Sequence, residues 1–133
     1  MTIHNKTDIQ SPAILLVEDT PSQAELFKTH LEENGCYVHW AQNGLDGLQA
    51  AQDQTYDLII LDIELPDIDG FEVCRRLKAD TAVAEIPVIM LTTRDEATDA
   101  LTGLERGAID YIPKDPFARL VLVETLRQMN LLD

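Results

Sequence analysis

The chain has 133 residues, of which 45% are hydrophobic and 26% are charged, a composition typical of one globular domain rather than of a disordered or collagen-like chain. Ten Lys and Arg residues against 24 Asp and Glu residues give a formal net charge of -14, which argues against direct binding to nucleic acid or to an anionic membrane. The apolar stretches are too short to span a bilayer, and two cysteines, Cys36 and Cys74, are too few for a disulfide framework, so we expect a cytoplasmic protein.

A change from polar to apolar residues marks the start of the predicted domain. Residues 1–12 are polar and lack periodicity, which is typical of a loose leader. Residues 13–17 form an apolar run that predicts a buried strand, and Glu18-Asp19 closes it. We therefore expect a single domain over residues 13–133.

Helix signals follow this strand directly. Thr20 has the residue type of an N-cap, Pro21 suits the first helical position, and Gln23 completes the spacing of a capping box. The helix is expected to end at Asn34-Gly35, where glycine accepts a left-handed backbone.

The alternation of an apolar strand with an amphipathic helix then repeats. Further strands are expected at residues 36–41, 57–62, 86–92 and 108–112, and further helices at residues 45–54, 71–79, 95–106 and 117–130. Strands that are apolar throughout are buried on both faces, and strands that alternate with helices pair in parallel through right-handed crossovers. The sequence therefore predicts an α/β fold, a doubly wound five-stranded parallel sheet with five helices.

Polar residues follow the carboxyl ends of several of these strands, which is where open parallel sheets carry functional groups. They are Glu18 and Asp19 after the first strand, Asp62 after the third, Thr92 after the fourth and Lys114 after the fifth. Each also has an ordinary explanation, since acids favour helix N-termini, threonine caps helices and a loop lysine is usually solvated. Their shared edge of the sheet favours a single functional site.

Three carboxylates at one edge require a cation, because two unit charges 4 Å apart repel by about 4 kcal/mol at an effective dielectric constant near 20. Oxygen ligands without a His or Cys cluster favour a hard ion such as Mg²⁺. A carboxylate beside such an ion and a lysine is suited to attack phosphorus, because the positive charges neutralise the phosphoryl oxygens. The residues therefore indicate phosphoryl transfer to an aspartate.

Five motifs occur in a fixed order along the chain. They are Val17-Glu18-Asp19, Asp62, Leu65-Pro66-Asp67-Ile68-Asp69-Gly70, Thr92 and residues 107–114. This set resembles bacterial response regulator receiver domains over about residues 13–130. The resemblance implies a flavodoxin-like topology with strand order 2-1-3-4-5 and a role in two-component signal transduction. It also implies a signalling phosphoacceptor, with self-catalysed phosphotransfer and autodephosphorylation, rather than a conventional enzyme.

The resemblance assigns roles to the residues around the predicted site. Asp62 would accept the phosphoryl group from a phosphohistidine of a sensor kinase or a phosphotransfer protein, and Thr92 and Lys114 would contact the phosphoryl oxygens. Phosphorylation would draw Thr92 inward and let Tyr111, which matches the aromatic switch of the family, rotate into the vacated space. A half-buried strand residue is the alternative explanation of Tyr111.

The same resemblance implies a set of metal ligands. Asp19 and Asp62 would bind Mg²⁺ (or Mn²⁺) directly, Glu18 would act mainly through a bound water, and the backbone carbonyl of Glu64 would add another ligand.

Two departures from the family pattern lie close to the site. Asp115 separates Lys114 from Pro116, so the usual cis bond before proline is not expected directly after the lysine, because a cis bond before a non-proline residue costs about 3 to 4 kcal/mol. Glu64 and Arg94 stand two positions after Asp62 and Thr92. We expect these two residues to pair across the site, to restrict the hydrolytic water and so to lengthen the lifetime of the phosphorylated form.

In the family, the fourth helix, fifth strand and fifth helix form the signalling surface, here about residues 95–106, 109–112 and 117–130. Residues 120–123 of the last helix are all apolar, whereas a surface helix needs only one apolar stripe. We expect a downstream protein or a second copy of the chain to bind this apolar part of the last helix. The sequence ends a few residues after this helix, which fits both a stand-alone regulator and a receiver cut from a longer protein.

Two other functions share parts of the pattern. A small phosphatase with an aspartyl-phosphate intermediate is one, because Asp62-Ile63-Glu64 has an acid-x-acid spacing. A flavodoxin-like electron carrier is the other, but Glu18 and Asp19 would repel the phosphate of its cofactor.

Overall fold

A computed structural model of the chain describes residues 11–93 and 97–133. Its strands are β1 (Ala13–Val17), β2 (Tyr37–Ala41), β3 (Leu58–Leu61), β4 (Val88–Thr92) and β5 (Asp110–Pro113). Its helices are α2 (Pro21–Glu33), α3 (Gly44–Asp53), α4 (Gly70–Ala79), α5 (Ala97–Glu105) and α6 (Ala118–Gln128). All strand pairs are parallel, in the order β2-β1-β3-β4-β5, so the predicted doubly wound fold is confirmed. The predicted leader, apart from its last two residues, lies outside the described residues.

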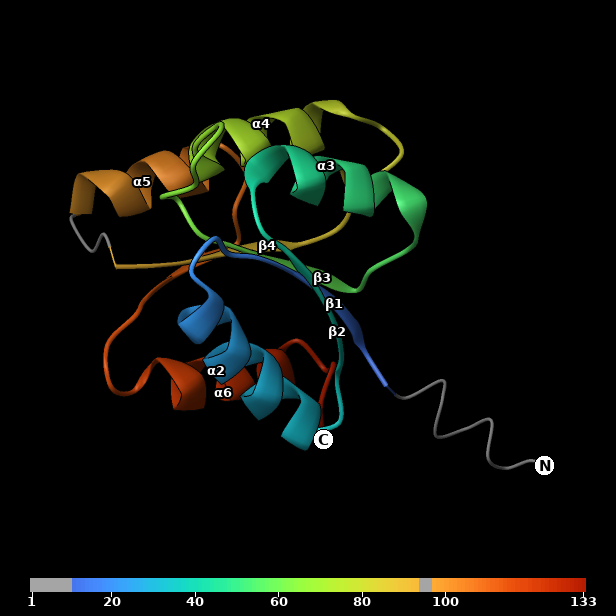
Figure 1. Cartoon of the computed structure of the whole chain (residues 1–133), viewed down its shortest axis with the longest axis vertical. Coiled ribbons are helices and arrows are strands. Elements are labelled where there is room, and N and C mark those ends of the chain that lie inside the picture. The colour runs from blue at the N-terminus through green and yellow to red at the C-terminus, as the bar shows by residue number, and fades with distance from the viewer. Residues whose placement is uncertain (1–10, 94–96) are drawn as a thin grey trace.

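The sheet is covered by helices on both faces, as Figure 1 shows, with α3, α4 and α5 on one side and α2 and α6 on the other. The residues of β3 are fully buried, because this strand lies between β1 and β4 and has helices above and below it. Burying each such side chain contributes about 1.5 to 3 kcal/mol. Two apolar clusters, one on each face, therefore hold the strand ends in fixed positions.

The first helix begins and ends where the sequence predicts, but its capping box does not form. Thr20 occupies the N-cap position, yet no backbone N–H of the described helix donates to its side chain. The Thr20 hydroxyl instead donates to Asp19 Oδ1 at 3.4 Å, so its side chain faces the acidic residues before the helix. At the other end, Gly35 has a φ of 95°, which confirms the predicted left-handed stop.

The last two strands begin later than predicted, for local reasons. The backbone N–H of Ala108 donates to the carbonyl of Gly103 at 3.0 Å, so Ala108 is bonded back to α5 rather than to the sheet, and β5 starts at Asp110. Pro87 has no N–H to give to a ladder, and β4 starts directly after it.

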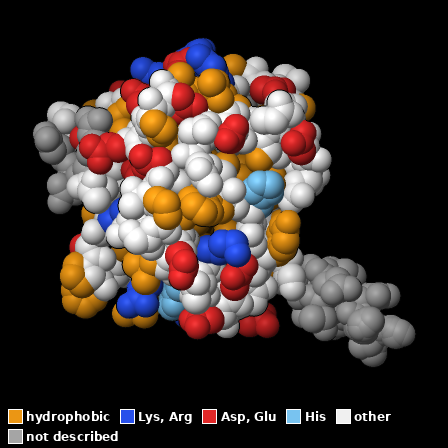
Figure 2. All heavy atoms as spheres, viewed as in Figure 1, with side chains coloured by type: hydrophobic (Ala, Val, Ile, Leu, Met, Phe, Trp, Pro, Cys, Tyr) orange, Lys and Arg blue, Asp and Glu red, His pale blue; other side chains and the backbone are white. Residues whose placement is uncertain are grey.

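The surface is strongly acidic, as the net charge of -14 requires. Figure 2 shows Asp and Glu side chains spread over one face of the molecule, with fewer Lys and Arg side chains between them. None of the helices within the described residues has the length and apolar character needed to cross a membrane.

Candidate functional site

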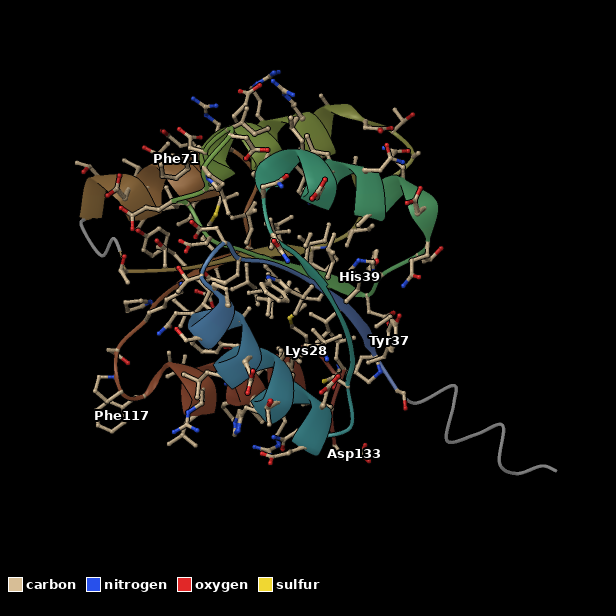
Figure 3. The ribbon with its side chains drawn as sticks, viewed as in Figure 1. Lys28, Tyr37, His39, Phe71, Phe117 and Asp133 are labelled. Atoms are coloured by element: carbon tan, nitrogen blue, oxygen red, sulfur yellow. The ribbon has the colours of Figure 1, made fainter. Side chains whose placement is uncertain are left out.

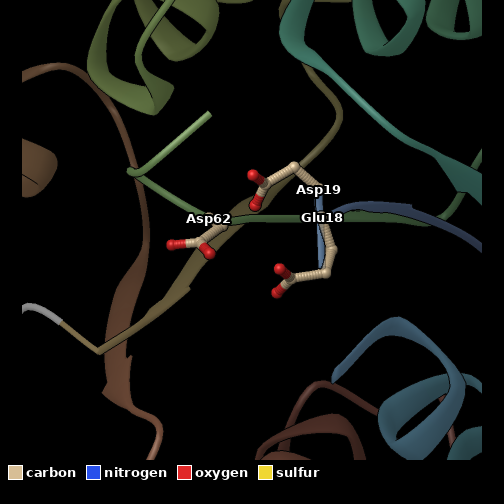
Figure 4. Close-up of side chains that lie close together, drawn as sticks. All are labelled: Glu18, Asp19 and Asp62. Carbon is tan, nitrogen blue, oxygen red and sulfur yellow. The ribbon is translucent and has the colours of Figure 1, made fainter. Parts of the chain in front are cut away.

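The predicted acidic residues meet at the carboxyl ends of the two central strands. Val17 of β1 pairs with Leu61 of β3, so the residues that follow, Glu18 and Asp62, leave the sheet at the same level. One carboxylate oxygen from each of Glu18, Asp19 and Asp62 lies within 4.8 Å of the others. Figure 4 shows the three side chains extending into one shared space. The convergence predicted from the sequence is therefore present.

Lys114 enters this cluster from the neighbouring strand pair. Thr92 pairs with Pro113, and the backbone N–H of Lys114 donates to the Thr92 carbonyl at 2.8 Å, which fixes the start of the lysine side chain. Its ammonium donates to Asp62 Oδ2 at 3.0 Å and also to Glu18 Oε1. The side chains of Lys114, Glu18 and Asp62 are 5%, 2% and 6% exposed. Buried charges are tolerated when they are paired in this way.

The same contacts shift the pKa values of the acid and the base. Burial raises the pKa of Glu18, and the hydrogen bond from Lys114 offsets that rise only in part. Burial acts in the opposite direction on Lys114, but the hydrogen bond to Glu18 and the charge of Asp62 outweigh it, and the pKa of Lys114 is raised. Lys114 therefore stays positively charged beside Asp62 at neutral pH.

The donor set fits a hard divalent cation. Three carboxylates and one ammonium have formal charges of three negative and one positive, which leaves two negative charges to balance. The donors are all oxygens, and exposed Asp19 lies on the solvent side of the two buried acids. Magnesium prefers such oxygen ligands and keeps part of its water shell, so these residues could hold Mg²⁺.

Thr92 and Tyr111 lie on adjacent strands near the cluster. Thr92 is fully buried at the end of β4. Tyr111 pairs with Met90 in the sheet and is half-buried, and a side-chain carbon placed on Gly103 of α5 would lie 3.5 Å from its ring. The ring therefore packs toward α5, as expected of a half-buried strand residue, and its switching role stays a prediction.

Glu64 accepts a hydrogen bond from Thr93 in the part of the chain that is described. The bond joins its carboxylate to the Thr93 hydroxyl at 2.8 Å. Arg94, the predicted partner, lies outside the described residues. The Glu64–Thr93 contact joins the loop after β3 to the loop after β4.

The peptide bonds of the loop after Lys114 are trans, as are those of the other described residues. The Asp115 N–H donates to the Pro113 carbonyl at 2.9 Å, and its carboxylate accepts the N–H of Phe117 at 2.8 Å. Asp115 thus turns the chain into α6 after the lysine.

Two residues that support the site carry roles that the sequence motifs did not reveal. A side-chain carbon on Gly70 would lie 2.2 Å from the backbone oxygen of Asp62, so only glycine lets α4 begin this close to the acidic site. Asp67 accepts the N–H groups of Gly44 and Leu45, both at 2.8 Å, and so ties the loop after Asp62 to the start of α3. The turn-forming residues signal a loop here, but they do not signal a contact more than 20 residues away.

Known proteins match both the sequence and the fold. A model of the response regulator receiver domain family matches residues 14–127. The protein PilH of Pseudomonas aeruginosa is 37% identical over 113 residues, which cover 85% of this chain and 93% of PilH. The transcriptional regulatory protein AfsQ1 of Streptomyces coelicolor is 41% identical over 110 residues, 83% of this chain but only 48% of AfsQ1, so the chain spans about half of that relative.

A solved structure of the chemotaxis response regulator CheY4 of Vibrio cholerae has the same architecture. It superposes with a TM-score of 0.81 and 29% sequence identity, over 89% of this chain and 98% of CheY4.

Proposed function

The chain belongs to the response regulator receiver domain family, and from this premise we propose that Asp62 is its phosphoacceptor in two-component signalling. The observation that carries the proposal is the contact of the Asp62 carboxylate with Lys114 at 3.0 Å, inside a cluster with Glu18 and Asp19. A buried aspartate beside a fixed ammonium and two further acids has no evident packing role. None of the similar proteins described above is named as a phosphatase or as an electron carrier, so the comparisons do not support these two alternatives.

The residues of the site are suited to transfer of a phosphoryl group to Asp62. Glu18, Asp19, Asp62 and the backbone carbonyl of Glu64 would hold Mg²⁺ or Mn²⁺, which neutralises charge on the phosphoryl oxygens. A carboxylate oxygen of Asp62 attacks phosphorus, the bond from phosphorus to the donor imidazole nitrogen breaks, and the imidazole leaves with that electron pair.

The other residues of the site act on the transferred group. The Lys114 ammonium, already 3.0 Å from Asp62 Oδ2, pairs with one phosphoryl oxygen, and the Thr92 hydroxyl donates to another. Movement of Thr92 toward the added charge then permits Tyr111 to change its position, which carries the signal to the surface around α5 and α6.

The expected phosphodonor is a phosphohistidine on a sensor kinase or a phosphotransfer protein. We expect the transfer to take place in the cytoplasm. The net charge of -14 argues against nucleic acid as a direct partner of this chain.

The test is incubation of the protein with acetyl phosphate, a small phosphodonor, followed by intact-mass measurement. We expect the mass of one phosphoryl group to be gained with Mg²⁺ present and not with excess EDTA. A protein that gains no mass with Mg²⁺, or gains the same mass in EDTA, would refute the proposed function. Calorimetric titration with MgCl₂ alone tests the cation site separately.

The contact between Glu64 and Thr93 is expected to affect how long the phosphoryl group stays on the protein. We propose that it closes the mouth of the site and slows the approach of hydrolytic water to the phosphoryl group. Thr93→Val keeps the side-chain shape but removes the donor, so loss of the phosphoryl group should become about two- to fivefold faster, in line with the net strength of one hydrogen bond. The decay of the phosphorylated mass after removal of phosphodonor measures this rate.

Glu64→Gln is the matched control for this prediction, because it removes the charge and keeps a carbonyl oxygen that accepts from Thr93. We expect a lifetime close to that of the unmodified protein. An unchanged lifetime in Thr93→Val would count against the proposed role of the contact.

The apolar surface of α6 is the proposed output contact. Phe117, Leu120 and Val121 are 65%, 66% and 45% exposed, and they line a hollow of about 410 Å³ together with Glu124, Thr125 and Gln128. Figure 3 shows Phe117 near the start of α6, pointing away from the sheet. We propose that a downstream protein or a second copy of the chain covers these side chains after phosphorylation.

Leu120→Gln should weaken this assembly without unfolding the domain, because a surface substitution usually changes stability by less than about 0.5 kcal/mol. Sedimentation velocity of the phosphorylated protein measures the change in self-association. Leu45→Gln, on α3 across the sheet, replaces a leucine that is 52% exposed and serves as the control. Equal behaviour of the two variants would exclude a second copy at Leu120.

A further inference from the structure

The edge strand β2 holds the backbone of Glu18 at two points. The Glu18 N–H donates to the carbonyl of Ala41 at 3.0 Å, which extends the pairing of β1 with β2 by one group. The indole Nε1–H of Trp40 donates to the Glu18 carbonyl at 2.6 Å. Two consecutive residues of β2 thus fix both polar groups of the Glu18 backbone. Figure 1 shows β2 running beside β1 at this edge of the sheet.

The Trp40 ring is itself held in place. It is half-buried and packs against the apolar cluster on the α2 and α6 side of the sheet. An indole has one donor and no acceptor, and this donor is already used at Glu18. The hydrogen bond therefore connects the packed side of the sheet to the first residue of the acidic cluster.

The position of Glu18 decides where two of the three carboxylates lie. Glu18 is 1% exposed, and its carboxylate accepts from Lys114 and from the Thr20 N–H at 3.1 Å. Asp19 is the next residue and is exposed, and its carboxylate accepts a long hydrogen bond of 3.4 Å from the Thr20 hydroxyl. Rotation of the peptide group between Glu18 and Asp19 would move the Asp19 carboxylate, and the Glu18 carbonyl is part of that peptide group.

We propose that Trp40 is a positioning residue for the acidic site. By holding the Glu18 carbonyl, it keeps the Glu18 and Asp19 carboxylates close to Asp62 before a divalent cation arrives. The inference rests on the proposed function, because it presumes that these acids bind such a cation. A site that is formed in advance binds more tightly than one that must first be ordered, in proportion to the fraction of molecules already in the competent state.

The test compares Mg²⁺ binding to the unmodified chain and to Trp40→Phe, which keeps an aromatic ring and removes the N–H. Calorimetric titration with MgCl₂ should show an affinity that is about three- to tenfold lower in Trp40→Phe. Tyr37→Phe is the matched control, because it changes an exposed aromatic residue at the other end of the same strand, as Figure 3 shows. This control should bind Mg²⁺ as tightly as the unmodified chain.

A spectroscopic measurement tests the proposal without relying on that variant. Trp40 is the only tryptophan, so a ¹H–¹⁵N spectrum has a single indole N–H resonance. We expect this resonance to shift during the Mg²⁺ titration. Half of the full shift should be reached at a free Mg²⁺ concentration equal to the dissociation constant found by calorimetry. The shift should be lost in Asp19→Asn, which removes a proposed cation ligand and leaves the indole hydrogen bond intact.

The possible results separate this inference from the proposed function. If the unmodified chain binds Mg²⁺ and gains a phosphoryl group, but the indole resonance does not shift or Trp40→Phe binds Mg²⁺ equally well, the role of Trp40 is wrong and the phosphoacceptor proposal survives. If the unmodified chain binds no Mg²⁺, both the cation site and the role of Trp40 are wrong.

Discussion

Asp62→Asn is expected to abolish phosphoryl incorporation completely. An amide has nearly the shape of the carboxylate it replaces, but its oxygen is a far weaker nucleophile and carries no charge to hold a cation. Lys114 would keep its contact with Glu18, so the neighbouring side chains should stay in place. The measurement is the intact mass after incubation with acetyl phosphate and Mg²⁺, with circular dichroism to confirm that the variant is folded.

Asp69→Asn provides the control for loss of one negative charge in the same loop. Asp69 caps α4 by accepting the N–H of Glu72 at 2.9 Å, and asparagine is nearly as good an N-cap as aspartate. This variant should be phosphorylated as the unmodified protein is. Phosphorylation of Asp62→Asn at the normal level would place the acceptor at another residue and would overturn the assignment.

The fold and the acidic cluster could be predicted from the sequence because both depend on patterns with a simple physical cause. A strand that is apolar throughout, such as residues 58–61, must be buried on both of its faces, and in a parallel sheet helices cover these faces. Once the strands are parallel, their carboxyl ends lie at one edge. The convergence of Glu18 and Asp62 then follows from the pairing of Val17 with Leu61, without any knowledge of side-chain conformations.

The contacts that orient the site could not be predicted in the same way. The hydrogen bonds of Trp40 to Glu18 and of Thr93 to Glu64 each join residues more than 20 positions apart, and each depends on one rotamer out of several. The Thr20 side chain could have capped its own helix, but its hydroxyl donates to Asp19 instead. Long-range contacts of single side chains leave no periodic signal in a sequence.

Lys114→Met is expected to lower the free energy of unfolding by about 3 kcal/mol when no divalent cation is present. The side chain has a similar volume, but it leaves Glu18 and Asp62 buried together without a positive charge. Removal of one partner from a buried ion pair typically costs 3 to 5 kcal/mol, because the remaining charge stays desolvated. Urea unfolding monitored by circular dichroism, in the presence of EDTA, measures the loss.

Divalent cations should reduce this loss. A cation that binds the folded state stabilises it by about 2.7 kcal/mol at a concentration 100 times its dissociation constant. Without the ammonium, the three carboxylates carry one more unbalanced charge and should hold Mg²⁺ more strongly. The difference in unfolding free energy between the variant and the unmodified protein should therefore shrink when MgCl₂ replaces EDTA.

Lys28→Met makes the same chemical change at an exposed ion pair. Lys28 contacts Glu32 at 2.9 Å, with side chains that are 37% and 44% exposed, so the loss should stay below about 0.5 kcal/mol, with or without Mg²⁺. Equal effects of the two substitutions would mean that burial does not amplify the charge of Lys114. A loss in Lys114→Met that Mg²⁺ leaves unchanged would mean that the cation does not bind among these carboxylates, because a charge placed there must relieve the repulsion that the missing lysine leaves behind.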